Sequence, residues 1–160
     1  MKRIILSLLL FIPLLLHAGG GDVKVYKGTS SYTSDVICTV RDGKVYQGNS
    51  SYTSDILCTI RGNRIYSGTS SYTSDVIFTI RDGKVYAGTS SYTSDVIFTI
   101  RDGKVYKGTS SYTSDILCTI RNGRVYSGTS SYTSDVVFSY SGNLTIEEFV
   151  AVLYSSLYIY

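Results

Sequence analysis

The chain has 160 residues, with 15 lysines and arginines, 12 aspartates and glutamates, one histidine and a formal net charge of +3. Two of the 15 basic residues, Lys2 and Arg3, precede an apolar run; without them, 13 basic residues stand against 12 acidic ones. A chain so nearly balanced lacks the general electrostatic attraction of a nucleic-acid binder, yet it is long enough for one domain with a real core.

The first 18 residues have the pattern of a secretory signal. Lys2 and Arg3 are followed by the apolar run IILSLLLFIPLLL, and the segment ends at Ala18 before three glycines. The run is short for a helix that crosses a bilayer, which needs about 20 apolar residues; an uncleaved membrane anchor is the alternative. We expect residues 1–18 to be a signal peptide, the only part that meets a membrane, and residues 19–24 to lead into the fold. The protein would then be exported, either to the periplasm or outside the cell.

Residues 25–144 repeat one pattern six times. The copy VYAGTSSYTSDVIFTIRDGK starts at Val85, and related copies start at residues 25, 45, 65, 105 and 125. A fixed period of this kind is typical of repeat architectures. Each copy holds two extended runs, DVIFTIR and KVYAGTS in one copy, joined by segments such as RDGK, RGNR and RNGR. These joints keep Asp, Asn or Gly where a tight turn needs them, so the sequence predicts six β-hairpins.

The pairing register within a hairpin can be argued from the one variable position of the repeat. A two-residue turn places this position on the same face as Cys38 and Val40. A three-residue loop places Phe78 opposite Tyr86 and sends the variable position to the other face. Because the position accepts Lys, Gln, Ser and Ala, we expect it to be wet and therefore predict the three-residue loop. The variable positions are Lys27, Gln47, Ser67, Ala87, Lys107 and Ser127.

One repeat position is aliphatic in all six copies, although this register places it on the face that we expect to be exposed to water. We call these six residues the aliphatic column. Either that face is covered as well, or the column forms an interaction surface. Its members are Ile37, Leu57, Ile77, Ile97, Leu117 and Val137.

Two arrangements of the repeats suit a period of twenty residues. In a β-solenoid, equivalent residues stack about 4.8 Å apart, and each pair of like charges would repel by roughly 3 kcal/mol. In an antiparallel meander they lie roughly 9.6 Å apart, where solvent screens the repulsion. We predict an all-β repeat fold: six β-hairpins in an antiparallel meander, closed or strongly curved, plus one C-terminal helix. A β-solenoid with 20-residue coils is the alternative.

The cysteines Cys38, Cys58 and Cys118 occupy one repeat position. Phe78, Phe98 and Phe138 fill it in the other copies, so we expect a buried apolar site. Three thiols also leave at least one unpaired, and the sequence does not decide their redox state.

The period ends at Leu144, and residues 145–160 are predicted to form a helix that caps the repeats. The segment TIEE is typical of a capping box, with Thr145 as the cap and Glu148 reaching back. The residues that follow are mostly apolar, so the helix should be buried at one mouth or face of the β-ring, as a plug or cap. An outer-membrane barrel is a weaker interpretation, because its strands need about 9–11 residues and these hold about seven.

The sequence offers little for catalysis. The single histidine, His17, lies in the predicted signal, so no Ser–His or Cys–His pair is expected in the exported chain. No CxxC zinc spacing, phosphate-binding glycine loop or calcium-loop pattern occurs. We therefore expect no enzyme activity, no catalytic or metal-binding residue and no cofactor.

The loop TSSYTSD is the one candidate for ligand binding. A tyrosine ring beside Ser, Thr and Asp can stack on a sugar while the polar groups bond its hydroxyls. In the plainer interpretation, each tyrosine packs over the neighbouring loop and each aspartate bonds its own loop amides. The candidate residues are Tyr32, Tyr52, Tyr72, Tyr92, Tyr112 and Tyr132, with Asp35, Asp55, Asp75, Asp95, Asp115 and Asp135.

An aromatic-x-Gly motif after a tight turn, as in GKVYAG, recurs throughout residues 25–130. In this it resembles the short hairpin repeats of β-flower-type bacterial proteins and, more distantly, MORN repeats. The β-flower resemblance implies hairpins arranged around a central axis and implies no established activity. The second and third glycines of the MORN pattern are missing, so that family's membrane and scaffold roles are not carried over.

Together these patterns predict an exported, non-enzymatic structural or interaction module. Its partner would be an unidentified protein or glycan and not a nucleic acid. The alternative function is a multivalent carbohydrate-binding protein that uses the six repeated loops, since avidity strengthens weak sites.

Overall fold

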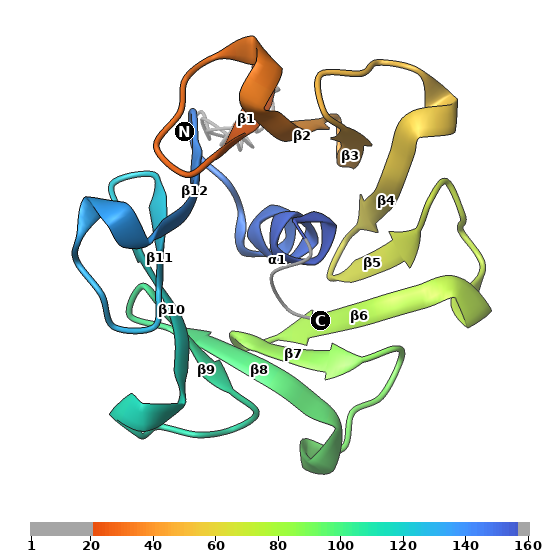
Figure 1. Ribbon diagram of the computed structural model, residues 1–160. Coiled ribbons are helices and arrows are strands. Elements are labelled where there is room, and N and C mark those ends of the chain that lie inside the picture. Colours follow the sequence, from red (N-terminus) through yellow and green to blue (C-terminus); the bar gives the residue numbers. More distant parts are fainter. Residues whose placement is uncertain (1–20, 157–160) are drawn as a thin grey trace, which may run out of the picture.

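The computed structural model describes residues 21–156, which form a ring of twelve strands around one α-helix (Figure 1). The predicted signal peptide, residues 1–18, and the last four residues of the predicted helical segment lie outside the described residues. The strands are β1 (Val23–Lys27), β2 (Val36–Arg41), β3 (Lys44–Gln47), β4 (Ile56–Arg61), β5 (Arg64–Ser67), β6 (Val76–Arg81), β7 (Lys84–Ala87), β8 (Val96–Arg101), β9 (Lys104–Lys107), β10 (Ile116–Arg121), β11 (Arg124–Ser127) and β12 (Val136–Tyr140).

Short 3₁₀ turns precede six of the strands, and the α-helix follows the last strand. The 3₁₀ turns are η1 (Thr33–Asp35), η2 (Thr53–Asp55), η3 (Thr73–Asp75), η4 (Thr93–Asp95), η5 (Thr113–Asp115) and η6 (Thr133–Asp135). The helix is α1 (Ile146–Ser155). Among the described residues, no helix is long and apolar enough to cross a membrane.

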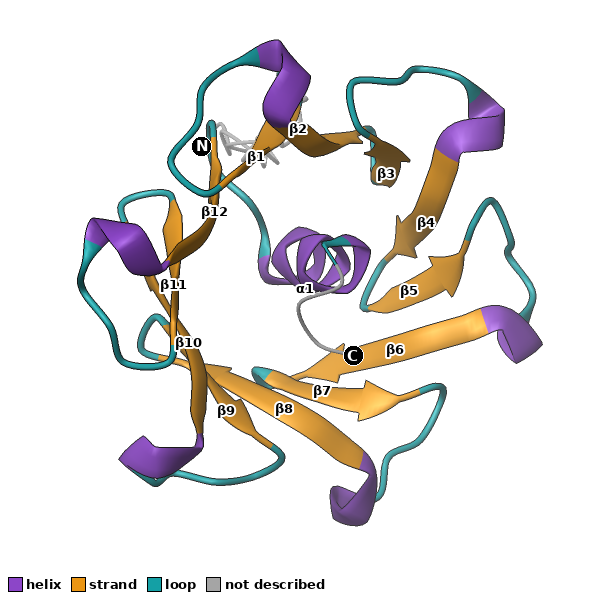
Figure 2. Ribbon diagram, viewed as in Figure 1, coloured by secondary structure: helices purple, strands orange, loops and turns teal. Residues whose placement is uncertain are grey.

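The sheet is a closed antiparallel barrel, as Figure 2 shows in a view along its axis. Every strand pairs with its neighbours in sequence, and β1 also pairs with β12 to close the ring. The predicted closed meander is therefore confirmed, and the β-solenoid alternative is wrong. Closure leaves no open sheet edge, which is the usual hazard of a sheet built from short strands.

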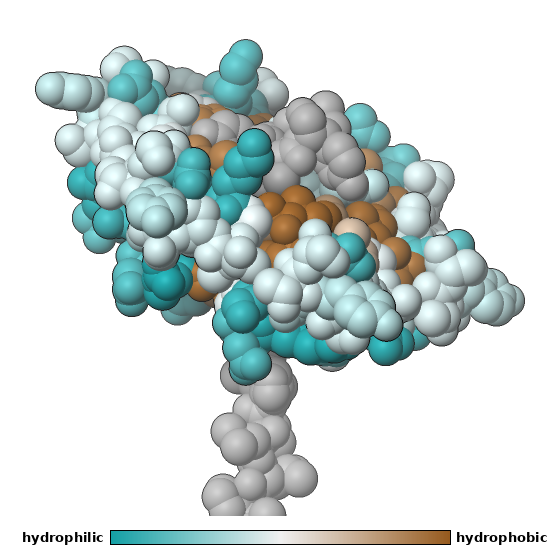
Figure 3. Space-filling view, turned by 90° about the horizontal axis from the view of Figure 1, so that it is seen from below, coloured by the Kyte–Doolittle hydropathy of each residue, from teal (hydrophilic) through white to brown (hydrophobic). Residues whose placement is uncertain are grey.

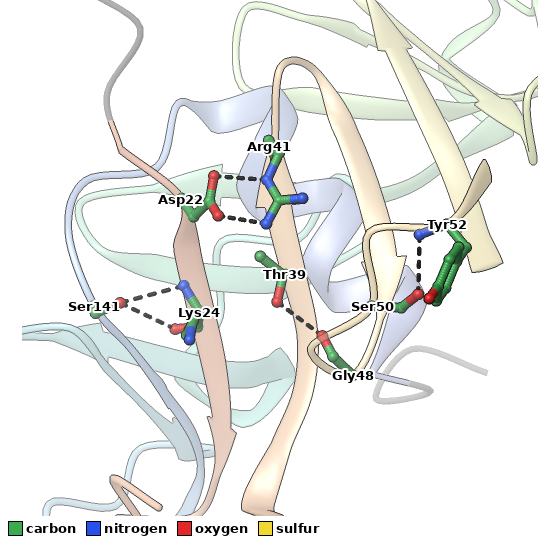
Figure 4. Close-up of polar contacts among 8 residues, drawn as sticks. All are labelled: Asp22, Lys24, Thr39, Arg41, Gly48, Ser50, Tyr52 and Ser141. Carbon is green, nitrogen blue, oxygen red and sulfur yellow. Dashed lines mark hydrogen bonds and ion pairs between the residues drawn. The ribbon is translucent and has the colours of Figure 1, made fainter. Parts of the chain in front are cut away.

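The closing pair is a hairpin made from the two ends of the repeat region. Val25 pairs with Tyr140 and Tyr26 with Ser139, which is the register of the continuous hairpins. At this junction the Ser141 amide donates to the Lys24 carbonyl at 3.0 Å. The Ser141 hydroxyl accepts from the Lys24 amide at 3.2 Å (Figure 4). Strand β12 is followed by α1 and not by another strand, so β1 takes the place of the second strand in the sixth hairpin.

The tight turns hold two residues, so the predicted three-residue loop is wrong. Arg41 pairs with Lys44, and between them Asp42 and Gly43 have φ values of 49° and 68°. Two successive positive φ angles suit the right-handed twist of a hairpin, and Asp and Gly tolerate them. The same register places Phe78 opposite Ala87 and not opposite Tyr86.

The variable position is exposed, as predicted, but not because it lies on the outer face of the sheet. Gln47 is paired with buried Cys38, yet it is the last residue of β3, where the chain leaves the sheet, and it stays exposed. The end of the strand, and not the alternation of faces, keeps this position wet.

A bulge does occur, but it lies between neighbouring hairpins. Val45 pairs with Cys58 and Tyr46 with Ile56, so Leu57 is the extra residue of the pairing. A bulge changes the direction of the side chain, and Leu57 and its equivalents pack against the core in a half-buried state. The aliphatic column expected on the wet face is thus part of the core boundary. Figure 3, a side view, shows hydrophobic surface in the middle of the molecule, flanked by hydrophilic outer parts.

Helix α1 lies inside the ring, where Val150, Ala151, Val152 and Leu153 are fully buried (Figure 1). The predicted capping box is present: the Thr145 hydroxyl accepts from the Glu148 amide, and the Glu148 carboxylate accepts from the Thr145 amide. A single layer of short strands would leave the middle of the ring empty. The helix fills this space and supplies much of the core.

Candidate functional site

The six loops, TSSYTSD in five copies and NSSYTSD in the second, join successive hairpins at the outer rim of the ring, where each carries its 3₁₀ turn (Figure 2). Each loop begins at a glycine with positive φ, for example 53° at Gly48, and ends where the next strand starts. A side chain rarely adopts this conformation, which explains the Tyr-x-Gly motif of every copy.

A serine and an aspartate hold each loop in one shape. In the second loop the Ser50 hydroxyl donates to the Asp55 carboxylate at 2.6 Å and accepts from the Tyr52 amide at 3.1 Å (Figure 4). The Asp55 amide donates to the Tyr52 carbonyl at 3.0 Å. The other five loops repeat these bonds. Each predicted aspartate therefore has a structural role within its own loop.

The six loop tyrosines are exposed, with 73–74% of each side chain open to solvent. They do not pack over neighbouring loops, which was the plainer interpretation of the sequence. A rigid loop that holds a large aromatic ring in water is suited to contact a partner, because little conformational entropy is lost on binding. The structure brings each tyrosine together with its own aspartate but keeps the six loops apart around the rim.

A second feature, which the sequence reasoning missed, is a groove of about 420 Å³ on the outer wall. It lies where the turn between β8 and β9 meets β10 and the loops around it. Its polar lining includes Asp102, Lys104, Thr113, Arg121 and Thr129. The Lys or Arg on both sides of the turn in five of the six copies is the sequence signal that could have indicated it.

The guanidinium of Arg121 is held in this groove by two contacts. It lies 5.1 Å from the centre of the Tyr126 ring, and its Nη2 donates to the Ser130 carbonyl at 2.6 Å. Three more arginines lie over the equivalent tyrosines: Arg41, Arg81 and Arg101. Such stacking fixes the planar group and leaves other N–H donors directed to solvent.

The interior offers no comparable chemistry. Cys38, Cys58 and Cys118 are fully buried and free of disulfides, which confirms the prediction that this position is an apolar core site. Burial raises the pKa of Cys38 and of Cys118 to about 12 and the pKa of Cys58 to about 11. Within residues 21–156, no group of three or more His, Cys, Asp or Glu side chains is arranged to hold a metal ion.

A smaller hollow of about 290 Å³ lies between the start of α1 and one side of the ring. It is lined mainly by apolar side chains, including Ile100, Ile120, Ile146 and Phe149. Partial burial there raises the pKa of Tyr140. This hollow lacks the charged groups that would orient a polar ligand.

Comparison with known proteins agrees with the sixfold geometry. The sequence model of one family, the 6-fold beta flower proteins, matches residues 25–153, which include all six hairpins and most of α1. No curated protein and no solved structure matches the chain. Because the match spans far more than half of its length, the chain belongs to the 6-fold beta flower protein family.

Proposed function

We propose that this protein is an exported, non-enzymatic interaction module that presents one tyrosine loop six times around a rigid ring. The observation that carries the proposal is the 73–74% exposure of all six loop tyrosines. A large aromatic ring that is left in water forgoes the favourable free energy of burial, and every copy of the repeat leaves its loop tyrosine in water. Binding to a partner recovers that burial.

The chemistry of the described residues supports a non-enzymatic role. The thiols are the strongest nucleophiles present, but burial favours their neutral form, and the thiolate is the reactive form. The loop aspartates are bonded to the serines of their own loops. Neither group is placed to act on a substrate.

Six equal loops favour a partner that is itself repetitive or that covers a surface. Each contact can be weak, because binding at one loop raises the effective concentration at the next. The Ser–Asp bonds hold the loops in shape, so that several can engage without much loss of freedom. An envelope polymer or a protein array outside the cell has the required repetition.

The test is a graded removal of the loop tyrosines. We expect the purified protein to sediment with isolated envelopes of the cells that express it. Tyr52→Ala with Tyr112→Ala should lower the affinity by about tenfold, and replacement of all six by Ala should abolish retention, as expected for avidity.

The matched control changes two exposed side chains near the rim that carry no ring. Gln47→Ala with Lys107→Ala should leave retention unchanged. Retention that survives the loss of all six tyrosines would contradict the proposal.

Carbohydrate binding is the second candidate, favoured by the groups beside each ring. Thr53, like its equivalents, is exposed next to the tyrosine, and its hydroxyl has no hydrogen-bond partner among the described residues. A hydroxyl both donates and accepts, as a sugar requires. A glycan array probed with the protein and with its Tyr92→Ala and Tyr112→Ala variants tests this. We expect binding that these variants weaken and that Tyr92→Phe retains; an array without any bound glycan would remove the candidate.

A further inference from the structure

We propose that the grooves on the outer wall bind the carboxylate groups of an acidic polysaccharide that wraps around the ring. This inference rests on the proposed function, because the rim tyrosines would hold the sugar units of the same chain. It adds the class of ligand and a second set of contacts. The groove beside β10, with Lys104 and Arg121, is the site on which it is built.

The donors of this groove are largely unused. Lys104 forms no ion pair among the described residues, and the hydroxyls of Thr113 and Thr129 have no hydrogen-bond partner there. Arg121 keeps N–H groups beyond the one bonded to Ser130. Two cations and two free hydroxyls at one concave site suit a carboxylate on a hydroxyl-rich molecule.

The acidic residue of the groove does not cancel these cations. Asp102 is exposed, and its carboxylate lies 3.9 Å from the guanidinium of Arg101, the residue before it in the chain. The groove beside β10 thus keeps a net positive charge. In the groove beside β6, the equivalent turn position is Gly62, so no carboxylate is present there.

The pairing register repeats the residues of this groove around the ring. A basic residue at the start of one hairpin strand pairs with the groove threonine of the next hairpin, as Lys104 does with Thr119. The equivalent pairs elsewhere in the ring are Lys44 with Thr59, Arg64 with Thr79, and Lys84 with Thr99. Arg61, Arg81 and Arg101 stand where Arg121 stands in the groove beside β10. Four successive junctions between hairpins therefore carry two basic residues each, and of these Arg101 lies 3.9 Å from the Asp102 carboxylate.

The ring closure interrupts this series. Ser141 occupies the position of the second arginine beside β12, so that groove has one cation fewer. Beside β2, Arg41 is bonded to Asp22, with Nε 2.8 Å from Oδ1 (Figure 4), and the Arg41 guanidinium holds the pKa of Asp22 below its usual value. The basic track thus covers four of the six hairpins and ends on both sides of the closure.

The placement of the cations favours a flexible chain over a flat surface. The basic side chains alternate with inward-facing core residues along their strands, so they point outward all around the ring. A membrane can touch only one side of such a wall. Tyr46, Tyr86, Tyr106 and Tyr126 each have an arginine over one face of the ring, so that face is not open for stacking nucleic-acid bases. A polymer of acidic sugars needs only the cations and the hydroxyls.

The experiment compares two polymers that differ only at the carboxyl group: polygalacturonate and the same polymer after reduction of each carboxylate to a neutral alcohol, each immobilised on a biosensor. We expect the protein to bind polygalacturonate at least tenfold more tightly. A variant with Arg61→Gln, Arg81→Gln, Arg101→Gln and Arg121→Gln should lose this preference. Raising the salt concentration from 50 to 500 mM should weaken polygalacturonate binding as well.

Two further variants keep the result open to contradiction. Replacement of the same four arginines by Lys preserves the charge and should retain most of the preference, whereas a variant that has lost its fold would not. Lys27→Gln with Lys107→Gln removes two cations outside the grooves and should change nothing.

Each other result would overturn the inference. Equal binding of both polymers, an unchanged preference in the four-glutamine variant, or tighter binding of single-stranded DNA would do so. Binding of both polymers that depends only on the tyrosines would overturn the groove inference while supporting the proposed function. Absence of binding to either polymer would overturn the groove inference, and the envelope assay would still test the tyrosine loops independently.

Discussion

Three cysteines lie in the dry interior of the ring, and their titration couples stability to pH. Burial raises the pKa of Cys38 and of Cys118 from 9.0 to about 12, and that of Cys58 to about 11. The nearby Cys58 raises the pKa of Cys38 further, while a contact of 3.7 Å with the Ser155 hydroxyl opposes the effect of burial at Cys58. In each case the folded state keeps its proton to a higher pH than the unfolded chain does.

The first prediction is therefore a loss of stability in alkali. Below pH 9 both states are protonated, and the contribution is fully present. Above pH 9 the unfolded chain releases its thiol protons first, so the free energy of unfolding falls until the folded thiols titrate, near pH 11 to 12. Each thiol contributes about 1.4 kcal/mol per pH unit in this window, as an upper limit. Urea unfolding under reducing conditions at pH 8, 9, 10 and 10.5 measures the slope.

The control for this prediction is Cys118→Phe, because phenylalanine fills the same position in three other copies. Removal of one of three thiols should reduce the cysteine part of the slope by about a third. The same slope in the variant and in the parent would show that other groups cause the alkaline loss.

At the scale of the elements, the choice between Cys and Phe follows the position of α1. The helix packs mainly against β2 to β5. At the repeat position that holds either Cys or Phe, β2 carries Cys38 and β4 carries Cys58. Strands β6, β8 and β12 carry phenylalanine there, and the Phe78 ring meets Tyr154 edge-on at 5.7 Å. Small side chains let the helix approach one side of the ring, and large ones fill the other. Cys118 does not follow this rule, and nothing in the packing explains it.

The second prediction is that Cys58→Phe destabilises the protein more than Cys118→Phe. Cys58 touches Ser155 of the helix, so a ring at this site must displace α1 or adopt a strained rotamer, at a cost of about 1–3 kcal/mol. Cys118 lies on β10, outside the strands that the helix mainly contacts. Thermal unfolding of both variants at pH 7 measures the difference. Equal stability would show that the off-centre position of α1 does not decide the residue type.

At the scale of the whole molecule, the ring is closed by non-covalent pairing between its two ends. Lys27 of β1 pairs with Phe138 of β12, and the equivalent pair inside a hairpin is Gln47 with Cys38. The two pairs have the same local geometry but differ greatly in sequence separation. They therefore form a matched set for measuring what closure contributes.

The third prediction uses disulfides at these two pairs. Lys27→Cys with Phe138→Cys, when oxidised, joins residues roughly 110 apart, and the chain-entropy model gives a stabilisation of about 4.8 kcal/mol. Gln47→Cys, oxidised onto native Cys38, closes a loop of about nine residues and gives about 2.6 kcal/mol. We expect the first variant to gain more on oxidation, measured as the free energy of unfolding against its own reduced form. If the long bridge does not form under mild oxidation, β1 and β12 are not paired in solution.

The register shows how far a pattern of residue types can be followed. The tolerance of one position for Lys, Gln, Ser and Ala correctly indicates that this position is wet. The pattern does not distinguish a residue on the outer face from one at the end of a strand, as Gln47 is. Nor does it show that Leu57 is turned toward the core by a bulge, because a bulge depends on the twist between neighbouring hairpins.

The candidate loops were predicted in part. Their residues, their repetition and the bonds of Asp55 within its own loop follow from local turn chemistry. The exposure of Tyr52 does not, because it depends on whether a neighbouring hairpin comes near. The outer groove was missed for the same reason: Lys104 and Arg121 come from different hairpins and meet only when the hairpins stand side by side.

The sequence by itself determined the local structure of this protein: six hairpins, turns at residues that tolerate positive φ, an apolar Cys/Phe position and a capped helix. These features depend on residues at most a few positions apart, so a short segment contains all the information that they need. Only the tertiary structure decided that Val25 pairs with Tyr140, that α1 lies inside the ring, and that a groove opens between two hairpins. Those features depend on closing a chain of more than a hundred residues, and that free energy is shared among contacts that no single segment contains.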